Sequence, residues 1–240
     1  MTANVTAIVR IRDQAPNDAE ALARMFESPD INDYGSRGCR PYTAADRLRT
    51  ILAATETGIP GFQFGIGFGD SGFRKEFQDP WPDSANQVSH FLTAVGLSFD
   101  PGTVSQTFFG IQVRDWIGAP PALSDADVAI RLCIGHEKAS DAASLVTALI
   151  RVRAQYAAAT AADVQNFRQA EAILGSGTPL QLTAALVALR SIQVNPSVYG
   201  NSYQDLLLTL CGWRLGKMIK NGIMQTGAGV AAWIRQNISA

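Results

Sequence analysis

The sequence has 240 residues, of which 47% are hydrophobic and 17% charged, and its formal net charge is −1. This length is sufficient for a large core, and the charged fraction lies below the roughly 25% typical of soluble domains, so we expect more of the chain than usual to be buried in the core or in an interface. The near-zero net charge, with Lys and Arg scattered along the chain, argues against nucleic acid and membranes as partners.

The cysteines and the N-terminal sequence bear on the cellular compartment. Cys39, Cys133 and Cys211 are widely spaced and include no CxxC pair, which argues against zinc ribbons and thioredoxin-like redox chemistry. Cys133 and Cys211 lie in apolar helical runs and are expected to be small buried hydrophobes. The N-terminal residues lack the apolar core of a signal peptide, and no window approaches the ~18 apolar residues of a membrane span. We therefore predict a cytoplasmic location.

Helix-start signals recur along the chain. An N-cap Ser, Thr or Asn followed three residues later by a carboxylate or amide can satisfy two backbone N–H groups reciprocally. Such pairs occur at Asn17/Glu20, Thr43/Asp46, Ser84/Gln87, Ser124/Asp127, Thr160/Asp163, Thr178/Gln181 and Ser202/Asp205. Together with apolar runs at helical spacing, they predict helices at about 17–28, 43–56, 84–98, 124–158, 160–174, 179–193, 202–221 and 227–238. We predict an all-α fold, a single globular domain of about eight helices over residues 1–240.

Some segments fit this pattern less well. The stretch 124–158 could be two helices, because Gly135 lies inside it. Residues 9–12 alternate apolar and polar side chains, which favours a short strand, and the alternation in residues 62–68 favours an extended segment. Two such short pieces do not build a sheet. Pro179 is expected at the first position of its helix, where its missing N–H costs nothing.

Residues 58–83 form a connection rich in glycine and aromatic residues, and its second half concentrates charge. The charged residues are Asp70, Arg74, Lys75, Glu76, Asp79 and Asp83. Long connections inside a compact helical domain are often functional, and glycine lets the backbone approach a ligand closely. The alternative is a packed surface loop whose charges are solvated.

The helix expected at 84–98 carries one of the two histidines, His90. One face of this helix is apolar, and Asn86 and His90 lie on nearly the opposite face. No charged residue occurs between Ser84 and Phe99, so we expect both faces to be covered. An enclosed imidazole requires polar partners.

The other histidine, His136, is followed directly by Glu137. On a helical projection both residues point toward the apolar side of their helix. A carboxylate in such a position is costly unless it is paired or protonated. Glu137 is therefore expected to have a partner, which could be His136, His90 or Arg74.

The leading hypothesis is a hydrolase-like enzyme whose site forms where the 58–83 loop, the 84–98 helix and the His136–Glu137 pair meet. A histidine oriented by a carboxylate can act as a general base, and a buried glutamic acid can act as a general acid. The acidic and aromatic lining favours a small polar molecule or a glycan as substrate. The predicted catalytic residues are His90, Glu76, His136 and Glu137, and the predicted substrate-binding residues are Asp70, Arg74, Asp79 and Asn86.

Two variants of this chemistry stay open. A glycosidase would use two carboxylates, Glu76 together with Asp70, Asp79 or Glu137. A mononuclear metal site could be built from the two histidines and a carboxylate, although the leading hypothesis assigns no metal and the sequence names no cofactor.

The alternative function is a non-catalytic helical interaction or assembly module that acts through low-charge helix faces. The stretch 206–219 has few charges and is nearly encircled by leucines, so it is either central or shared with another chain. Gly212 and Gly216 are spaced for close helix packing, and we interpret them as a core contact against the 84–98 helix. A homo-oligomer or a protein partner would explain the low charged fraction.

Overall fold

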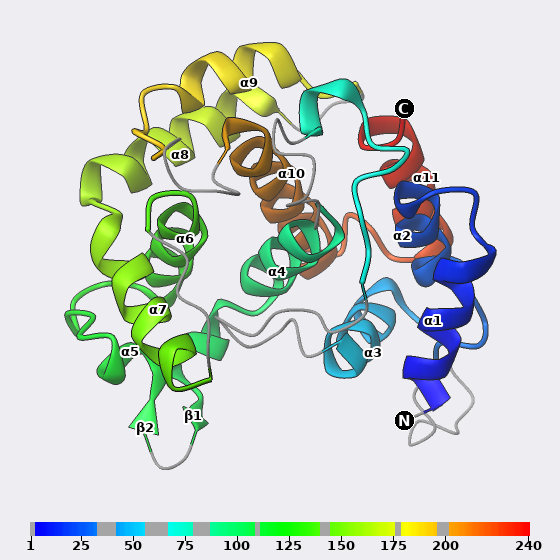
Figure 1. The fold of residues 1–240 in the computed structure, drawn as a ribbon, viewed down its shortest axis with the longest axis horizontal. Coiled ribbons are helices and arrows are strands. Elements are labelled where there is room, and N and C mark those ends of the chain that lie inside the picture. Colours follow the sequence, from blue (N-terminus) through cyan, green and yellow to red (C-terminus); the bar gives the residue numbers. More distant parts are fainter. Residues whose placement is uncertain are drawn as a thin grey trace.

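The computed structural model describes residues 3–32, 42–55, 67–78, 87–108, 111–139, 145–175, 179–195 and 202–240. Within these residues the protein is all-α, as predicted, with eleven α-helices and a single hairpin of two-residue strands (Figure 1). The helices are α1 (Ala3–Gln14), α2 (Asp18–Glu27), α3 (Ala44–Thr55), α4 (Gln87–Phe99), α5 (Val113–Trp116), α6 (Asp125–His136), α7 (Leu145–Ala158), α8 (Ala161–Leu174), α9 (Leu182–Leu189), α10 (Tyr203–Lys220) and α11 (Gly227–Asn237). The short elements are the 3-10 helices η1 (Lys75–Phe77) and η2 (Pro101–Ser105) and the strands β1 (Thr107–Phe108) and β2 (Ile111–Gln112).

The helices α4 and α10 lie at the centre of the molecule and share its most extensive helix–helix contact (Figure 1). Gly212 and Gly216 of α10 make this contact close. A Cβ atom added at Gly212 would lie 2.6 Å from the carbonyl oxygen of Phe91, and one added at Gly216 would overlap the backbone of Val95. The predicted packing of the two glycines against this helix is therefore confirmed.

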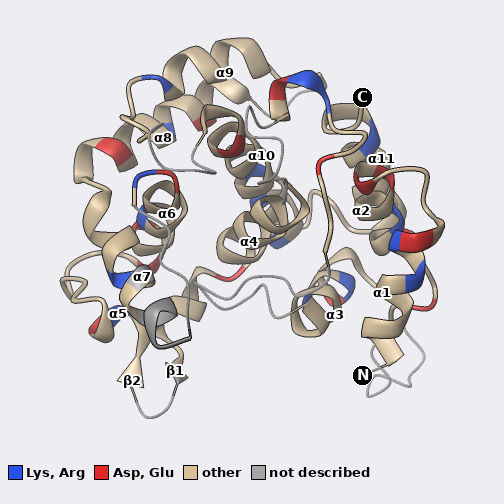
Figure 2. Ribbon diagram, in the orientation of Figure 1, with Lys and Arg blue, Asp and Glu red and all other residues tan. Residues whose placement is uncertain are grey.

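The leucine-rich helix α10 is covered within one chain. Its side chains from Leu206 to Leu210 are all buried, and so is Ile219 near its other end. The helix α4 carries no Lys, Arg, Asp or Glu, and Figure 2 shows it without either charge colour. The buried faces of these two low-charge helices are part of the core of this chain.

The other helices flank this pair on two sides. On one side α11 packs on α2, where Arg235 contacts Glu20 at 2.8 Å and Glu27 at 2.6 Å (Figures 1 and 2). The helices α6, α7 and α8 lie on the other side, and α9 crosses the top of the view above α10 (Figure 1). Among the described helices, none combines the length and the apolar character that a membrane crossing requires.

Most of the predicted helix starts are confirmed. The side chains of Asn17, Thr43, Ser124, Thr160 and Ser202 each accept a hydrogen bond from the backbone N–H three residues later. The pairs beginning at Ser84 and Thr178 lie outside the described residues. The long stretch 124–158 is two helices, α6 and α7.

Two predictions along the chain are corrected. Residues 9–12 belong to α1 and not to a strand, because Ile8 and Ile11 are buried together at helical spacing. The helix expected at 179–193 begins only at Leu182, so Pro179 is not at its first position. The four-residue helix α5 was not predicted. Of the segment 62–68, only Gly67 and Phe68 are described, and neither lies in a strand.

Asp163 provides a test of the helix caps that depends on pH. Burial raises the pKa of Asp163, but hydrogen bonds from Lys138 and Thr160 outweigh this effect, so the pKa is lowered from its ordinary value of 3.8. A carboxylate with a lowered pKa stabilises the fold above its unfolded pKa, and this stabilisation is lost as the pH falls through the folded pKa.

We therefore expect Asp163→Asn to cost about 1 kcal/mol at neutral pH and almost nothing in acid well below 3.8. Urea unfolding of both proteins at the two pH values would measure this difference. An equal cost at both values would contradict the assignment of the effect to the ionised carboxylate.

Candidate functional site

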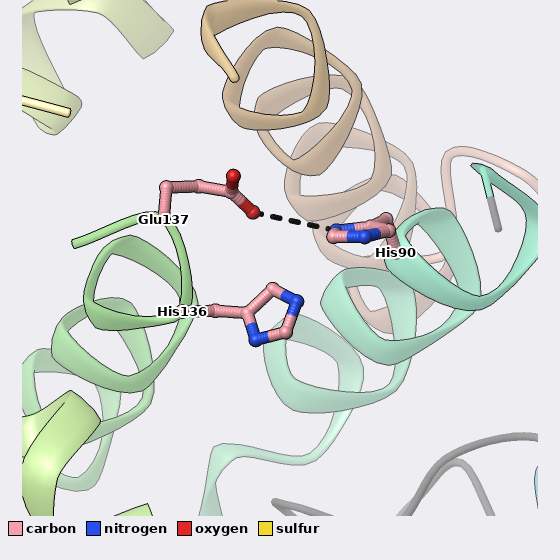
Figure 3. A group of neighbouring side chains, drawn as sticks. All are labelled: His90, His136 and Glu137. Atoms are coloured by element: carbon pink, nitrogen blue, oxygen red, sulfur yellow. Dashed lines mark ion pairs between the residues drawn. The ribbon is translucent and has the colours of Figure 1, made fainter. Parts of the chain in front are cut away.

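Two histidines and one glutamate from separate parts of the chain meet beside the central helix pair. His90 lies on α4, His136 is the last residue of α6, and Glu137 follows it (Figure 3). One ligand-type atom from each of the three side chains lies within 4.8 Å of the other two. Among the described residues, this is the only group of three or more His, Cys, Asp or Glu side chains placed closely enough to hold a metal ion.

The end of α6 explains how two consecutive residues face the same point. The helix ends at His136, and the N–H of Glu137 bonds to the carbonyl of Ile134 in a tight final turn. The carbonyl of Glu137 then accepts a hydrogen bond of 3.2 Å from the backbone N–H of Asn195. This turn directs Glu137 into the protein beside the His136 ring.

The carboxylate of Glu137 is fully buried. Its Oε2 atom accepts a hydrogen bond of 3.0 Å from the backbone N–H of Ser202, and its Oε1 atom lies 3.4 Å from Nδ1 of His90. Oε1 accepts no hydrogen bond from the described residues. A buried carboxylate is costly without a positive partner, and His90 is the histidine placed to provide one.

The contact with Ser202 continues into a buried polar network at the start of α10. The hydroxyl of Ser202 donates to Asp205 at 2.8 Å, and Asp205 accepts from the side-chain amide of Gln87 at 2.7 Å. In a complete capping box the carboxylate at N3 would accept the N–H of the N-cap residue. Here the N–H of Ser202 bonds to Glu137 instead, so the start of α10 orients the glutamate.

The His136 ring is held by α7. Gln155, which is buried on α7, places its side-chain Nε2 atom 2.9 Å from Nδ1 of His136. A Cβ added at Gly135 would overlap the carbonyl oxygen of Gln155, so the glycine permits the close approach of α6 and α7 that makes this contact. The centroids of the His90 and His136 rings are 4.8 Å apart (Figure 3).

Cys133 lies one turn before His136 on α6. Burial raises the pKa of this thiol to about 12, and the charge of Glu137 adds to the effect. The thiol is therefore neutral at physiological pH and is a poor nucleophile. The prediction that Cys133 and Cys211 are buried is confirmed.

The other predicted site residues lie elsewhere or outside the described chain. Asp70, Arg74 and Glu76 belong to the segment 67–78. The backbone N–H of Arg74 donates a hydrogen bond of 2.9 Å to the carbonyl of Ile238, which connects this segment to the C-terminal end of the chain. Arg74 and Glu76 are 3.7 Å apart, and each is about one-third exposed. None of the three belongs to the His90, His136 and Glu137 cluster. Asp79 and Asn86 lie outside the described residues.

Sequence reasoning missed the residues that support this cluster. Gln155 carried no signal, because a single glutamine in an amphipathic helix is ordinary. Ser202 and Asp205 were identified only as a helix cap. Their connection to Glu137 spans 65 residues of chain, so no local pattern could indicate it.

The arrangement suits proton transfer or cation binding. It combines two imidazoles with a buried carboxylate, and hydrogen bonds from other helices fix the orientation of Glu137 and His136. In comparisons with known proteins, no family model, no curated protein and no solved structure matches this chain.

Proposed function

We propose that this chain is a hydrolase-like enzyme whose site is the His90, His136 and Glu137 cluster. The observation that carries the proposal is the fully buried Glu137 carboxylate 3.4 Å from Nδ1 of His90. A carboxylate in this position orients an imidazole and stabilises its protonated form, as general base catalysis requires. His90 would take a proton from a water molecule, and the Glu137 carboxylate would stabilise the imidazolium that results.

His136 would face the substrate, because it is partly exposed whereas His90 and Glu137 are buried. The proposal keeps a small polar molecule or a glycan as substrate. We also propose that Asp70, Arg74, Asp79 and Asn86 bind the substrate and that Glu76 acts as an acid. A glycosidase variant would use two carboxylates. The proposal further includes a single domain, with the 58–83 loop beside the site, and a cytoplasmic location.

The second candidate is an interaction or assembly module, with a homo-oligomer or a protein as partner. Such a module was expected to act through low-charge helix faces such as that of 206–219, which lies on α10; α4 is a second helix of low charge. Both helices are buried within the chain. Their low charge is accounted for by the core, which favours the enzyme.

The test compares His90→Ala and Glu137→Gln with the unchanged chain on chromogenic esters, phosphate esters and glycosides. We expect both variants to lose turnover by at least about 100-fold, while circular dichroism shows that they remain folded. Glu171→Gln is the matched control, because Glu171 is also buried but pairs with Lys217 at 2.5 Å on α10. It should keep full turnover.

The module makes the opposite prediction. His90→Ala would then destabilise the fold by about 1 kcal/mol or more, because buried partners would lose their hydrogen bonds, and no substrate would be turned over. That pair of results would contradict the enzyme proposal.

A further inference from the structure

We propose that His90, His136 and Glu137 together bind a divalent transition-metal ion of the zinc class. This inference deepens the proposed function, since it uses the same three residues, but it can be tested without any substrate. Two imidazoles and one carboxylate are a common ligand set for zinc and related ions, and catalytic zinc sites typically have three protein ligands and one open position.

The spacing of the donor atoms fits such an ion. Two ligands at about 2.1 Å from a tetrahedral ion lie about 3.4 Å from one another. Oε1 of Glu137 and Nδ1 of His90 are separated by this distance, 3.4 Å. All three donor atoms lie within 4.8 Å of one another, so closing the group to the 3.4 Å spacing around an ion shortens no separation by more than about 1.4 Å.

The orientation of Glu137 also fits a ligand. Ser202 holds Oε2 through a backbone N–H at 3.0 Å, which turns Oε1 toward the two rings (Figure 3). A normal charge-assisted hydrogen bond between His90 and this oxygen would be about 2.7–2.9 Å long, and the observed separation is 3.4 Å. A divalent cation between these atoms would neutralise the buried carboxylate more completely than a histidine contact of this length.

Gln155 would position His136 as a ligand. Figure 3 shows one ring nitrogen of His136 turned toward His90 and the other turned away. Nδ1 contacts the Gln155 amide at 2.9 Å, so Nε2, the nitrogen turned toward His90, is the one that would coordinate the ion. Metal binding through Nε2 requires the ring proton on Nδ1, so it requires the Gln155 amide turned by about 180°, with its oxygen in place of its nitrogen as the acceptor of that proton.

The partial exposure of His136 places the open position on its side of the cluster. A water molecule bound there would lose a proton near neutral pH and become the nucleophile of a hydrolysis. His90 would then hold the ion as a ligand, and the ion in place of a histidine general base would activate the water. The metal site therefore specifies how the proposed hydrolase would generate its nucleophile.

The experiment titrates Zn²⁺ into the full chain after treatment with a chelator, using calorimetry and the rise in melting temperature that binding causes. We expect one ion per chain. Glu137→Gln, His90→Ala and His136→Ala should each weaken binding by at least about 100-fold, and Gln155→Ala by about 10-fold. Co²⁺ in place of Zn²⁺ should give the visible absorption of a tetrahedral site, and Glu137→Gln should lose it.

Two variants serve as controls. Cys133→Ser lies one turn from the ligands but outside the cluster, and Glu171→Gln removes a buried carboxylate that pairs with Lys217. Both should bind Zn²⁺ as the parent does. Glu137→Gln is nearly isosteric, and circular dichroism would show that it remains folded, so loss of binding can be assigned to the ligand.

Absence of Zn²⁺ binding by the parent, or equal binding by Glu137→Gln, would overturn the proposal. The two proposals fail separately. If turnover persists unchanged in chelator, the metal proposal is wrong and the His90–Glu137 enzyme stands. If Zn²⁺ binds tightly through these ligands but no substrate is turned over, the metal site stands and the hydrolase proposal is wrong.

Discussion

Replacing Gly135 with alanine is expected to lower the free energy of unfolding by about 3 kcal/mol. The new Cβ would overlap the carbonyl oxygen of Gln155 and would lie 2.9 Å from the Cα of Gln155. These are backbone atoms, so no side-chain rotation can relieve the overlap, and α6 and α7 must separate. The cost should exceed the roughly 1 kcal/mol that alanine normally gains over glycine inside a helix.

The same substitution should also disturb the site. Separation of α6 and α7 moves Gln155 away from Nδ1 of His136, a contact of 2.9 Å. Chemical denaturation would measure the stability, and the Zn²⁺ titration would measure the effect on His136. Gly67→Ala is the control, because a Cβ at Gly67 meets no atom within 4 Å. If Gly135→Ala were as stable as Gly67→Ala, the close approach of α6 and α7 would be incorrect.

Gly135 also shows which features a local sequence pattern can predict and which it cannot. The sequence indicated that this glycine could divide a long helix, and the chain does form two helices there. However, α6 continues through Gly135 and ends one residue later. The glycine permits close packing against α7. A single sequence does not indicate which other helix a glycine packs against, so this contact could not be predicted.

The helix starts were predictable because capping is local: a side chain bonds to a backbone N–H three residues away. The start of α9 was not predictable for the converse reason. Before this helix, the N–H of Leu180 bonds to Asn237 at 3.3 Å, and the N–H of Gln181 bonds to Leu174 at 3.2 Å. Contacts with α11 and α8 hold this segment outside the helix that its cap-like pattern suggested.

The candidate site was likewise predictable only in part. The approach of His90, His136 and Glu137 followed from one argument, that a buried carboxylate and enclosed imidazoles need partners. The argument could not decide which charged residues join them, and Asp70 and Glu76 are not in the cluster. Their segment is fixed by contacts with α2 and the C-terminal end, such as the 3.1 Å bond between the N–H of Ser71 and Asp18.

Asp205→Asn is expected to cost about 3 kcal/mol of stability, because it alters a buried carboxylate that accepts hydrogen bonds from two side chains. Asp205 is 1% exposed and accepts from Gln87 at 2.7 Å and from Ser202 at 2.8 Å. Asparagine keeps the shape but turns one of the two acceptors into a donor. It also removes a negative charge from the first turn of α10, where the helix dipole favours one.

Asp127→Asn is the matched control, because Asp127 occupies the same N3 position of α6 after Ser124 but its side chain is 22% exposed. Its substitution should cost less than about 1 kcal/mol. Equal costs would mean that the cap alone matters and that the buried network does not. A larger cost at Asp205, together with weaker Zn²⁺ binding, would show that the start of α10 holds Ser202 where its N–H orients Glu137. The cluster would then depend on a helix cap that lies 65 residues further along the chain.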